Sequence, residues 1–273
     1  LEIFLPPSGS FSDMKLKAIY GKNDGSQSYA PYELVSRSSA MTLGRGKMSK
    51  VQKTLSGFFG GGDGSAAYPY VIADKDQFKA LSTIGNTTTA GYSHTGSLYY
   101  DYNATAKRNY FRSAGANYRQ SADFDFDGAD LSGFLIGIQG NNGDAASFKG
   151  IYDGDGKTIS NFSIALPSTD YVGLFPNVGG EIRNLTLKDI SVTGQQAVGG
   201  IVGWLNGMIT DCSVTGTSSV TGTNGTAGIA ANIRNTSVVS GCTNYASVNG
   251  TGNVGGVVGY MANAGKLSLD RKS

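Results

Sequence analysis

The sequence predicts an all-β fold: a right-handed parallel β-helix (solenoid) with a short capping helix and a separate N-terminal segment. Two observations support this fold class. Glycine supplies 41 of the 273 residues, about twice its ordinary share, and there is no Gly-X-Y period of the kind that marks collagen. A glycine-led pattern also recurs, first as "VGGIVGWLNGMITDCSVTG" (198–216) and again as "VGGVVGYMANAGKLSL" (254–269).

Charge and aromatic content exclude several classes of protein. Charged residues make up 15% of the chain, and Tyr and Phe number 15 and 12, which is the reverse of the pattern typical of disordered proteins. The net charge of +2 gives no strong attraction to nucleic acid. No apolar run approaches the roughly 20 residues of a membrane-spanning helix. We therefore expect an ordered β protein with no nucleic-acid partner and no membrane-spanning segment.

Residues 1–61 form the first predicted domain, an N-terminal segment of unknown fold that ends in a glycine-rich linker. Its opening letters, "LEIFLPP", indicate a short apolar strand that Pro6 and Pro7 terminate. The linker falls within "GFFGGGDGS" (57–65), where the glycines favour a turn. The sequence assigns no role to residues 1–56.

Residues 62–147 form the second predicted domain, the opening region of the β-helix. Within it, "DKDQFKALST" (74–83) predicts a short amphipathic helix with Asp74 as N-cap and with Phe78 and Leu81 on one face. Such a helix is well placed to cap the first coil. A Tyr-rich insertion at 92–118 follows, and two roles remain open for its aromatic rings: stacking on sugar rings, or covering the first coil. These rings belong to Tyr99, Tyr100, Tyr102 and Tyr110.

Residues 148–273 form the third predicted domain, a run of solenoid repeats. Gly173, Gly200, Gly228 and Gly256 are spaced by 27, 28 and 28 residues. A second set of anchors, Ile159, Ile182, Ile209 and Val239, is spaced by 23, 27 and 30 residues. A unit of 20–30 residues built from short strands and turns has the size of one solenoid coil.

The repeat also predicts which side chains face inward. An Asn lies two residues after Ile159 and again after Ile182, and Asn tolerates the left-handed backbone that a bend requires. Stacked coils place like side chains about 4.8 Å apart, so apolar positions form ladders and glycines allow three sharp turns per coil. The expected inward residues are Ile201, Val202, Leu205, Ile209, Val257 and Val258. Cys212 and Cys242 are expected on adjacent coils as free, buried thiols, since parallel Cβ vectors suit a disulfide poorly.

These segments resemble a known family. "VGLFPNVGGEIRNLTLKDISVTG" followed by "VGGIVGWLNGMITDCSVTG" resembles the GLUG repeat of large bacterial surface proteins. "GSAAYPYVIADKDQFKALS" (64–82) resembles the segment that opens such regions. "ADFDFDG" (122–128) and "FKGIYDGDGKTISNFSI" (148–164) resemble what lies between that segment and the repeats, and the likeness extends over residues 62–265. Ala231 departs from the pattern where a glycine is expected, which predicts an irregular coil there. The resemblance implies an extracellular β-helical module without chemistry of its own.

Catalysis finds little support among the residues. His94 is the single histidine, and a Ser-His-Asp or Cys-His arrangement would have to use it. One His and two Cys do not make a conventional zinc site. We therefore expect no enzyme, no catalytic residue and no cofactor.

Calcium is the one metal that the sequence raises. Asp123, Asp125 and Asp127 are spaced like the first half of a calcium loop, with Gly128 at the sharp turn. Phe134 occupies the twelfth position, where a bidentate Glu is required. The alternative is a strand with outward Asp and inward Phe that ends in a turn at Asp127–Gly128, and the alternation favours it.

The sequence thus predicts a secreted or cell-surface module for adhesion or structural assembly. Its expected binding surfaces are the exposed Thr, Ser and Asn faces of the coils and the Tyr-rich insertion at 92–118. Its expected partners are another protein chain or a surface ligand; a glycan and self-assembly through the solenoid ends are further options. The final strand "KLSL" (266–269) carries little that would cap an exposed edge, so it could pair with residues 1–5 of a neighbour, or be followed by another coil in a longer protein. The alternative function is a carbohydrate-binding or carbohydrate-processing β-helix.

Overall fold

The computed structural model describes residues 59–62, 64–86, 116–137, 147–234, 236–262 and 265–268, together with four short strands between residues 9 and 43. The chain divides into two compact units, residues 1–58 with 92–103, and residues 59–91 with 104–273. In the first unit, β1 (Gly9–Phe11) pairs antiparallel with β4 (Met41–Leu43), and β2 (Lys15–Ala18) pairs antiparallel with β3 (Tyr32–Ser36). The first seven residues, His94 and the Tyr-rich insertion up to residue 115 lie outside the described residues.

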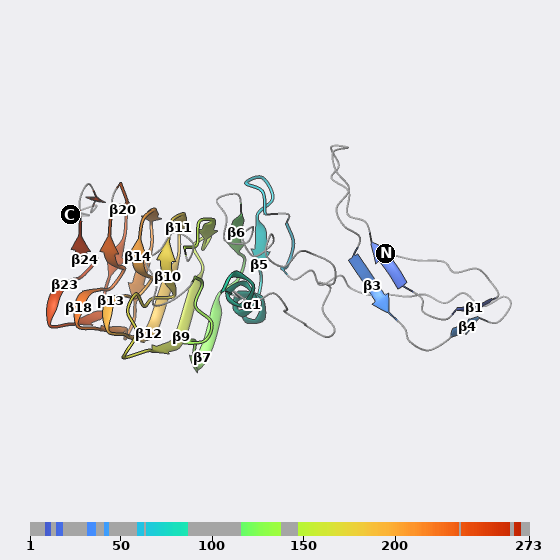
Figure 1. Cartoon of the computed structure of the whole chain (residues 1–273), viewed down its shortest axis with the longest axis horizontal. Coiled ribbons are helices and arrows are strands. Elements are labelled where there is room, and N and C mark those ends of the chain that lie inside the picture. Colours follow the sequence, from blue (N-terminus) through green and yellow to red (C-terminus); the bar gives the residue numbers. More distant parts are fainter. Residues whose placement is uncertain are drawn as a thin grey trace. The chain divides into compact units, whose positions relative to one another are not determined.

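The second unit is a parallel β-solenoid, which confirms the predicted fold class (Figure 1). Its opening elements are β5 (Tyr70–Ile72), α1 (Lys75–Asn86), β6 (Asn117–Gln120) and β7 (Phe124–Asp130). We name the four coils that follow A to D. Coil A holds β8 (Ile151–Asp153), β9 (Thr158–Ala165) and β10 (Phe175–Val178); coil B holds β11 (Glu181–Arg183), β12 (Thr186–Thr193), β13 (Gln196–Gly199) and β14 (Val202–Leu205). Coil C holds β15 (Met208–Thr210), β16 (Ser213–Thr215), β17 (Ser219–Thr221), β18 (Asn224–Ala227) and β19 (Ala230–Ile233); coil D holds β20 (Val238–Ser240), β21 (Thr243–Asn244), β22 (Ser247–Asn249), β23 (Gly252–Gly255) and β24 (Val258–Met261), and β25 (Lys266–Ser268) comes last.

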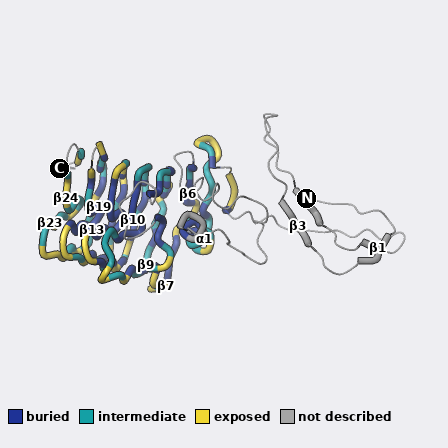
Figure 2. The backbone as a smooth tube through the Cα atoms, viewed as in Figure 1, coloured by how far each residue is buried: buried dark blue, intermediate teal, exposed yellow. Residues whose placement is uncertain are grey.

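Equivalent strands of successive coils pair in parallel, so the sheets run along the length of the solenoid. The strand orders are β10-β14-β19-β24 in one sheet and β13-β18-β23 in another, while β25-β20-β15-β11-β8-β6-β5 forms a third. Buried positions run through the coils (Figure 2), and most of their side chains are apolar. Ile201, Val202, Leu205 and Ile209 are all fully buried, which confirms their predicted direction.

One of the two predicted ladders was aligned wrongly. Ile182 pairs with Tyr152, and the same ladder continues through Ile209, Val239 and Leu267. Ile159 instead pairs with Leu187, on a different side of the coil. The segments around Ile159 and Ile182 look alike because each places an apolar residue two positions before a bend, although the two bends belong to different corners.

Each coil turns at three corners, and most of these corners hold a residue with a left-handed backbone. The φ angles lie between +50° and +70°. The first corner holds Asn184, Asp211 and Gly241, the second Asn161, Asp189 and Gly216, and the third Tyr171, Ala197, Gly225 and Asn253. The left-handed geometry predicted for the two Asn is confirmed. Glycine, however, occupies few of these corners, because Asn and Asp tolerate the left-handed region through local hydrogen bonds.

The first end of the solenoid is closed. The backbone of Gly60 and Gly61 hydrogen-bonds to Val71 of β5, with N···O distances of 2.7 and 2.9 Å. Helix α1 lies beside β7, and the ring of Phe78 packs against that of Phe126 at 5.9 Å between centroids. Asp74 caps the helix by accepting the Gln77 N–H at 2.8 Å. The predicted capping helix is therefore confirmed, although it runs to residue 86 rather than 83.

The other end of the solenoid is open within the described part of the chain. Val257 and Val258 are only half-buried, so the prediction that they are buried is wrong. Their equivalents in coil C, Ile229 and Ala230, are fully buried because coil D covers them. No described residue covers coil D in the same way, and its outer positions appear exposed in Figure 2.

Two further predictions concern coil C. The pairing of β19 with β14 and β24 stays in register through Ala231, so the irregular coil predicted there is wrong; the buried methyl group is small enough to fit. Cys212 and Cys242 are both free and buried, and the Thr243 N–H donates to the Cys212 carbonyl of the adjacent coil at 3.0 Å. The two thiols thus occupy one ladder, as predicted, and burial raises the pKa of Cys212.

Candidate functional site

The most regular surface of the molecule is a set of uncharged polar rows on coils B, C and D. Each row follows a strand whose alternate side chains point outward. The rows are Ser191, Thr193 and Gln195 in coil B; Ser219, Thr221 and Thr223 in coil C; and Ser247, Asn249 and Thr251 in coil D. We call these nine residues the hydroxyl face. All are exposed except Thr193 and Ser219, which are half-buried.

Parallel pairing places the rows of the hydroxyl face in register. Ser191 pairs with Ser219 and Ser219 with Ser247, so these hydroxyls repeat about every 4.8 Å along the stack. The Ser219 hydroxyl donates to that of Ser191 at 3.4 Å. Thr223 donates its hydroxyl to the Gln195 carbonyl at 2.7 Å, and Thr251 donates to that of Thr223 at 3.0 Å. These bonds along the stack fix the side chains as an ordered array.

An open groove of about 420 Å³ adjoins the hydroxyl face. It is lined by carboxylates, an amide, hydroxyls and two apolar side chains: Asp125, Asp127, Gly128, Asn161, Phe162, Ser163, Asp189, Ile190, Ser191, Thr217 and Ser219. The second corner of the solenoid passes through it, since Asn161 and Asp189 are corner residues. Such a mixture of acceptors and donors around small apolar patches can bind polar ligands by hydrogen bonds.

The three predicted calcium ligands each have hydrogen-bond or ion-pair partners within the protein. Asp123 accepts the Thr158 N–H at 2.7 Å. Asp125 accepts both the Asp127 N–H and the Asn161 amide, each at 2.9 Å. Asp127 pairs with Lys75 at 2.9 Å. Among the described residues, no three His, Cys, Asp or Glu side chains gather into a group that could hold a metal ion.

The segment that contains these Asp residues is a strand, β7, as the alternative interpretation predicted. In β7, Phe124 and Phe126 are buried, whereas Asp125 and Asp127 are exposed, as the alternation predicted. The strand does not end at Asp127–Gly128, however. Both residues have positive φ, and the pairing with β9 shifts register there, so the predicted turn is a bulge within the strand.

Hydrogen bonds keep the groove carboxylate of Asp125 ionised. The backbone N–H of Asp127 and the side-chain amide of Asn161 both donate to it and lower its pKa. A hydrogen bond to the charged form favours that form. The Asp125 carboxylate can therefore accept hydrogen bonds from ligand hydroxyls. A general acid for glycoside cleavage needs the opposite, a carboxyl group with a raised pKa.

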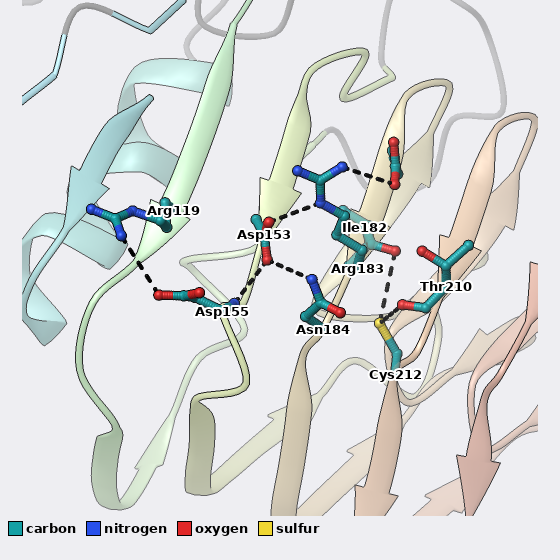
Figure 3. A network of polar contacts seen from close by, with 9 residues as sticks. Arg119, Asp153, Asp155, Ile182, Arg183, Asn184, Thr210 and Cys212 are labelled. Atoms are coloured by element: carbon teal, nitrogen blue, oxygen red, sulfur yellow. Dashed lines mark hydrogen bonds and ion pairs between the residues drawn. The ribbon is translucent and has the colours of Figure 1, made fainter. Parts of the chain in front are cut away.

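A second polar network connects the start of coil A to coil B (Figure 3). Asp153 accepts hydrogen bonds from Arg183 Nε at 2.8 Å, from Asn184 Nδ2 at 2.9 Å and from the Asp155 N–H at 2.9 Å. Arg119 adds an ion pair to Asp155 at 3.7 Å. Partial burial raises the pKa of Asp153, but the hydrogen bonds from Asn184, Asp155 and Arg183 outweigh it and lower the pKa overall. This network stabilises the junction of two coils.

The Asp153 network predicts a pH-dependent contribution to stability. The folded pKa lies below the value of about 3.9 for an unfolded chain, so the carboxylate stabilises the fold above that pH, and the contribution is lost as pH falls through the folded pKa. We expect Asp153→Asn to lower the melting temperature at pH 7, with the gap to the unsubstituted protein closing below about pH 4. Thermal melts across this range measure the gap; a gap of constant size would contradict the assignment.

Sequence reasoning found part of this surface. The exposed Thr, Ser and Asn positions were expected outward, but their alignment into rows depends on register. The groove was missed, because Asp125 and Asp189 lie 64 positions apart in the chain and only stacking brings them together. The Tyr side chains predicted to stack on sugars lie outside the described residues.

Comparison with known proteins identifies one of the repeats. Residues 194–221 match the family described as the GLUG motif, which confirms the GLUG repeat recognised in the sequence. Over 119 residues, 43% of this chain, the sequence is 40% identical to Halomucin from Haloquadratum walsbyi, and the chain spans about 1% of the length of that protein.

A solved structure from Bacteroides ovatus, provisionally described as an immunoglobulin A1 protease, also resembles this chain. It shares 18% sequence identity with a TM-score of 0.47, and the match covers 78% of this chain and 68% of that one. At that TM-score the likeness carries no functional implication. Within the described ranges, no helix combines the length and apolar character needed to cross a bilayer.

Proposed function

We propose that this chain is a non-enzymatic extracellular module, secreted or displayed on a cell surface, that serves adhesion or structural assembly. The observation that carries the proposal is the hydroxyl face. Nine uncharged polar side chains repeat in register over three coils, and hydrogen bonds along the stack hold those of Ser191, Ser219, Thr223 and Thr251. The low charge of this region suits a contact surface that does not depend on salt.

Rigidity supports the same proposal. In coils B and C the outward side chains belong to strands that pair with a neighbouring strand on each side. Binding therefore costs little side-chain entropy. Extended arrays of small contacts on a solenoid are a usual means of binding large ligands. A partner therefore meets a preformed surface.

A triple substitution in coil C tests the adhesive role. We expect Ser219→Ala with Thr221→Ala and Thr223→Ala to reduce retention of the purified chain on whole cells by about a hundredfold, since three lost hydrogen bonds at about 1 kcal/mol each sum to about 3 kcal/mol. The control is Ser168→Ala with Thr236→Ala and Thr243→Ala, which changes three exposed hydroxyls outside the face. Equal retention of the two triple variants would refute the role of the hydroxyl face.

Treating the cells identifies the class of ligand. Retention that protease removes and periodate leaves intact supports a protein partner. Retention that periodate abolishes supports the second candidate, a carbohydrate-binding β-helix, which the groove beside Asp125 and Asn161 favours. An assay of reducing ends released from polysaccharides tests cleavage, which the ionised Asp125 does not favour.

A further inference from the structure

The groove beside the hydroxyl face repeats the same chemistry from coil to coil. Three segments contribute to its lining: 161–163 in coil A, 189–191 in coil B and 217–219 in coil C. Each begins with a polar residue at or beside the second corner and ends with an outward serine, and the three serines pair in register. Because stacked strands lie about 4.8 Å apart, the groove runs along the stack with an equivalent set of groups on each coil.

Two apolar side chains lie between the polar rows of the groove. Phe162 and Ile190 pair with each other in register and are 3% and 1% exposed. A ligand therefore meets a narrow apolar strip with polar groups on both sides. A polar polymer that lies along the stack can repeat its contacts on each coil, whereas a single small molecule can use only one set of them.

The groove carboxylates are held in place by the protein and keep capacity for further hydrogen bonds. Asp125 accepts two bonds, from the Asp127 N–H and from the Asn161 amide. Asp189 accepts the Thr217 N–H at 2.7 Å. An ionised carboxylate has about four acceptor sites, so both groups can still accept hydrogen bonds from ligand hydroxyls. Such bonds to a charged acceptor are about twice as strong as those between neutral groups.

We propose that this groove binds a neutral polysaccharide, with the sugar chain extended along the solenoid axis. Asp125, Asp127 and Asp189 all line it, so a polymer of uronic acids or sulfated sugars would bring like charges together. A neutral sugar chain supplies a dense row of hydroxyl donors and acceptors without that repulsion. The proposal rests on the second candidate under Proposed function, carbohydrate binding, and gives it a ligand class and a place.

The strand pairing argues against an extended peptide as the ligand. A peptide that adds to a sheet needs a free strand edge. The strands that line the groove have none: β9 pairs with β7 and β12, β12 with β9 and β17, and β17 with β12 and β22. A sugar chain needs no free edge, because its hydroxyls bond to side chains.

Binding of the full chain to immobilised glucan, mannan, galactan and xylan tests the proposal, with polygalacturonate as the anionic counterpart. We expect binding to at least one neutral polymer and at least tenfold weaker binding to polygalacturonate. Ser191→Trp fills the groove from an exposed position and should weaken binding at least tenfold. Ser168→Trp is the control, because Ser168 is also exposed but lies outside both the groove and the hydroxyl face; it should bind like the unsubstituted chain.

A second variant keeps the test decisive if Ser191→Trp fails to fold. Asp125→Asn preserves the size of the side chain but removes its charge, and should weaken binding about tenfold. Absence of binding to all four neutral polymers overturns the proposal, as does equal binding by the Ser191→Trp and Ser168→Trp variants or tighter binding to polygalacturonate.

Retention on cells separates this proposal from the function on which it rests. If periodate abolishes retention but Ser191→Trp and Ser168→Trp are retained equally, carbohydrate binding stands and its placement in the groove is overturned. If periodate leaves retention intact while Ser191→Trp still loses binding to the purified polymer, adhesion to cell-surface sugars fails and the groove site is supported.

Discussion

Replacing Ile201 with Asp will lower the free energy of unfolding by roughly 4 kcal/mol or more, because an unpaired carboxylate would enter a dry apolar ladder and a buried side chain would be lost. Ile201 is fully buried, and its N–H donates to the Ile229 carbonyl of the next coil at 3.1 Å. The cation nearest to it in sequence is Lys188, which is exposed and pairs with Asp189 at 3.9 Å rather than lying in the buried ladder.

The matched control is Val257→Asp. Val257 is the equivalent residue 56 positions later, in coil D, where it is only half-buried. A carboxylate there keeps part of its hydration, so the loss should be less than half of that at Ile201. Chemical denaturation with both variants measures the difference, at a protein concentration low enough to keep the chain monomeric. Equal losses would show that coil D is covered as fully as coil B.

Replacing Gly200 with Ala will destabilise the chain by about 2–4 kcal/mol, because the added methyl group cannot fit between coils. A Cβ at Gly200 would lie 2.3 Å from the Gly228 carbonyl oxygen and 3.3 Å from a methyl group of Val214. The first of these contacts is with backbone that stacks in register, so relief requires the coils to separate. The glycine here is required by close approach rather than by its φ angle.

Gly256→Ala is the internal control for this second prediction. Gly256 occupies the same ladder as Gly200 and Gly228, but nothing lies within 4 Å of a Cβ built on it. The substitution should therefore be neutral, or stabilising by up to about 1 kcal/mol through the reduced entropy of the unfolded chain. Melting temperatures at high dilution report both variants. If Gly256→Ala were as harmful as Gly200→Ala, some part of the chain would have to cover coil D.

Much of the architecture follows from the sequence because it depends on local rules. Inward positions must be apolar or small, corners must accept a left-handed backbone, and both requirements recur with each coil. The burial of Ile201 and Leu205, the left-handed Asn161 and the capping by Asp74 could therefore be predicted. Strand alternation likewise placed Phe124 inward and Asp125 outward.

Other features depend on which coil lies against which, and local pattern does not contain that information. The segments around Ile159 and Ile182 share an apolar residue and an Asn at the same spacing, yet one bend belongs to the second corner and the other to the first. Only the pairing of Ile182 with Tyr152 distinguishes them. Coil lengths vary by a few residues, so a small error in alignment moves a strand to another side of the solenoid.

The candidate site shows the same division. Sequence by itself determined that this chain is a β-solenoid that contains a GLUG repeat and carries small polar residues on the outside, because the alternation of a strand fixes the direction of each side chain. The tertiary structure alone decided that Ser191, Ser219 and Ser247 stack in register across three coils and that Asp125 shares a groove with Asp189. It also decided that Val257 is half-buried while Ile201 is buried: two residues of the same pattern differ because burial depends on a covering coil, and a covering coil is a property of the assembled solenoid.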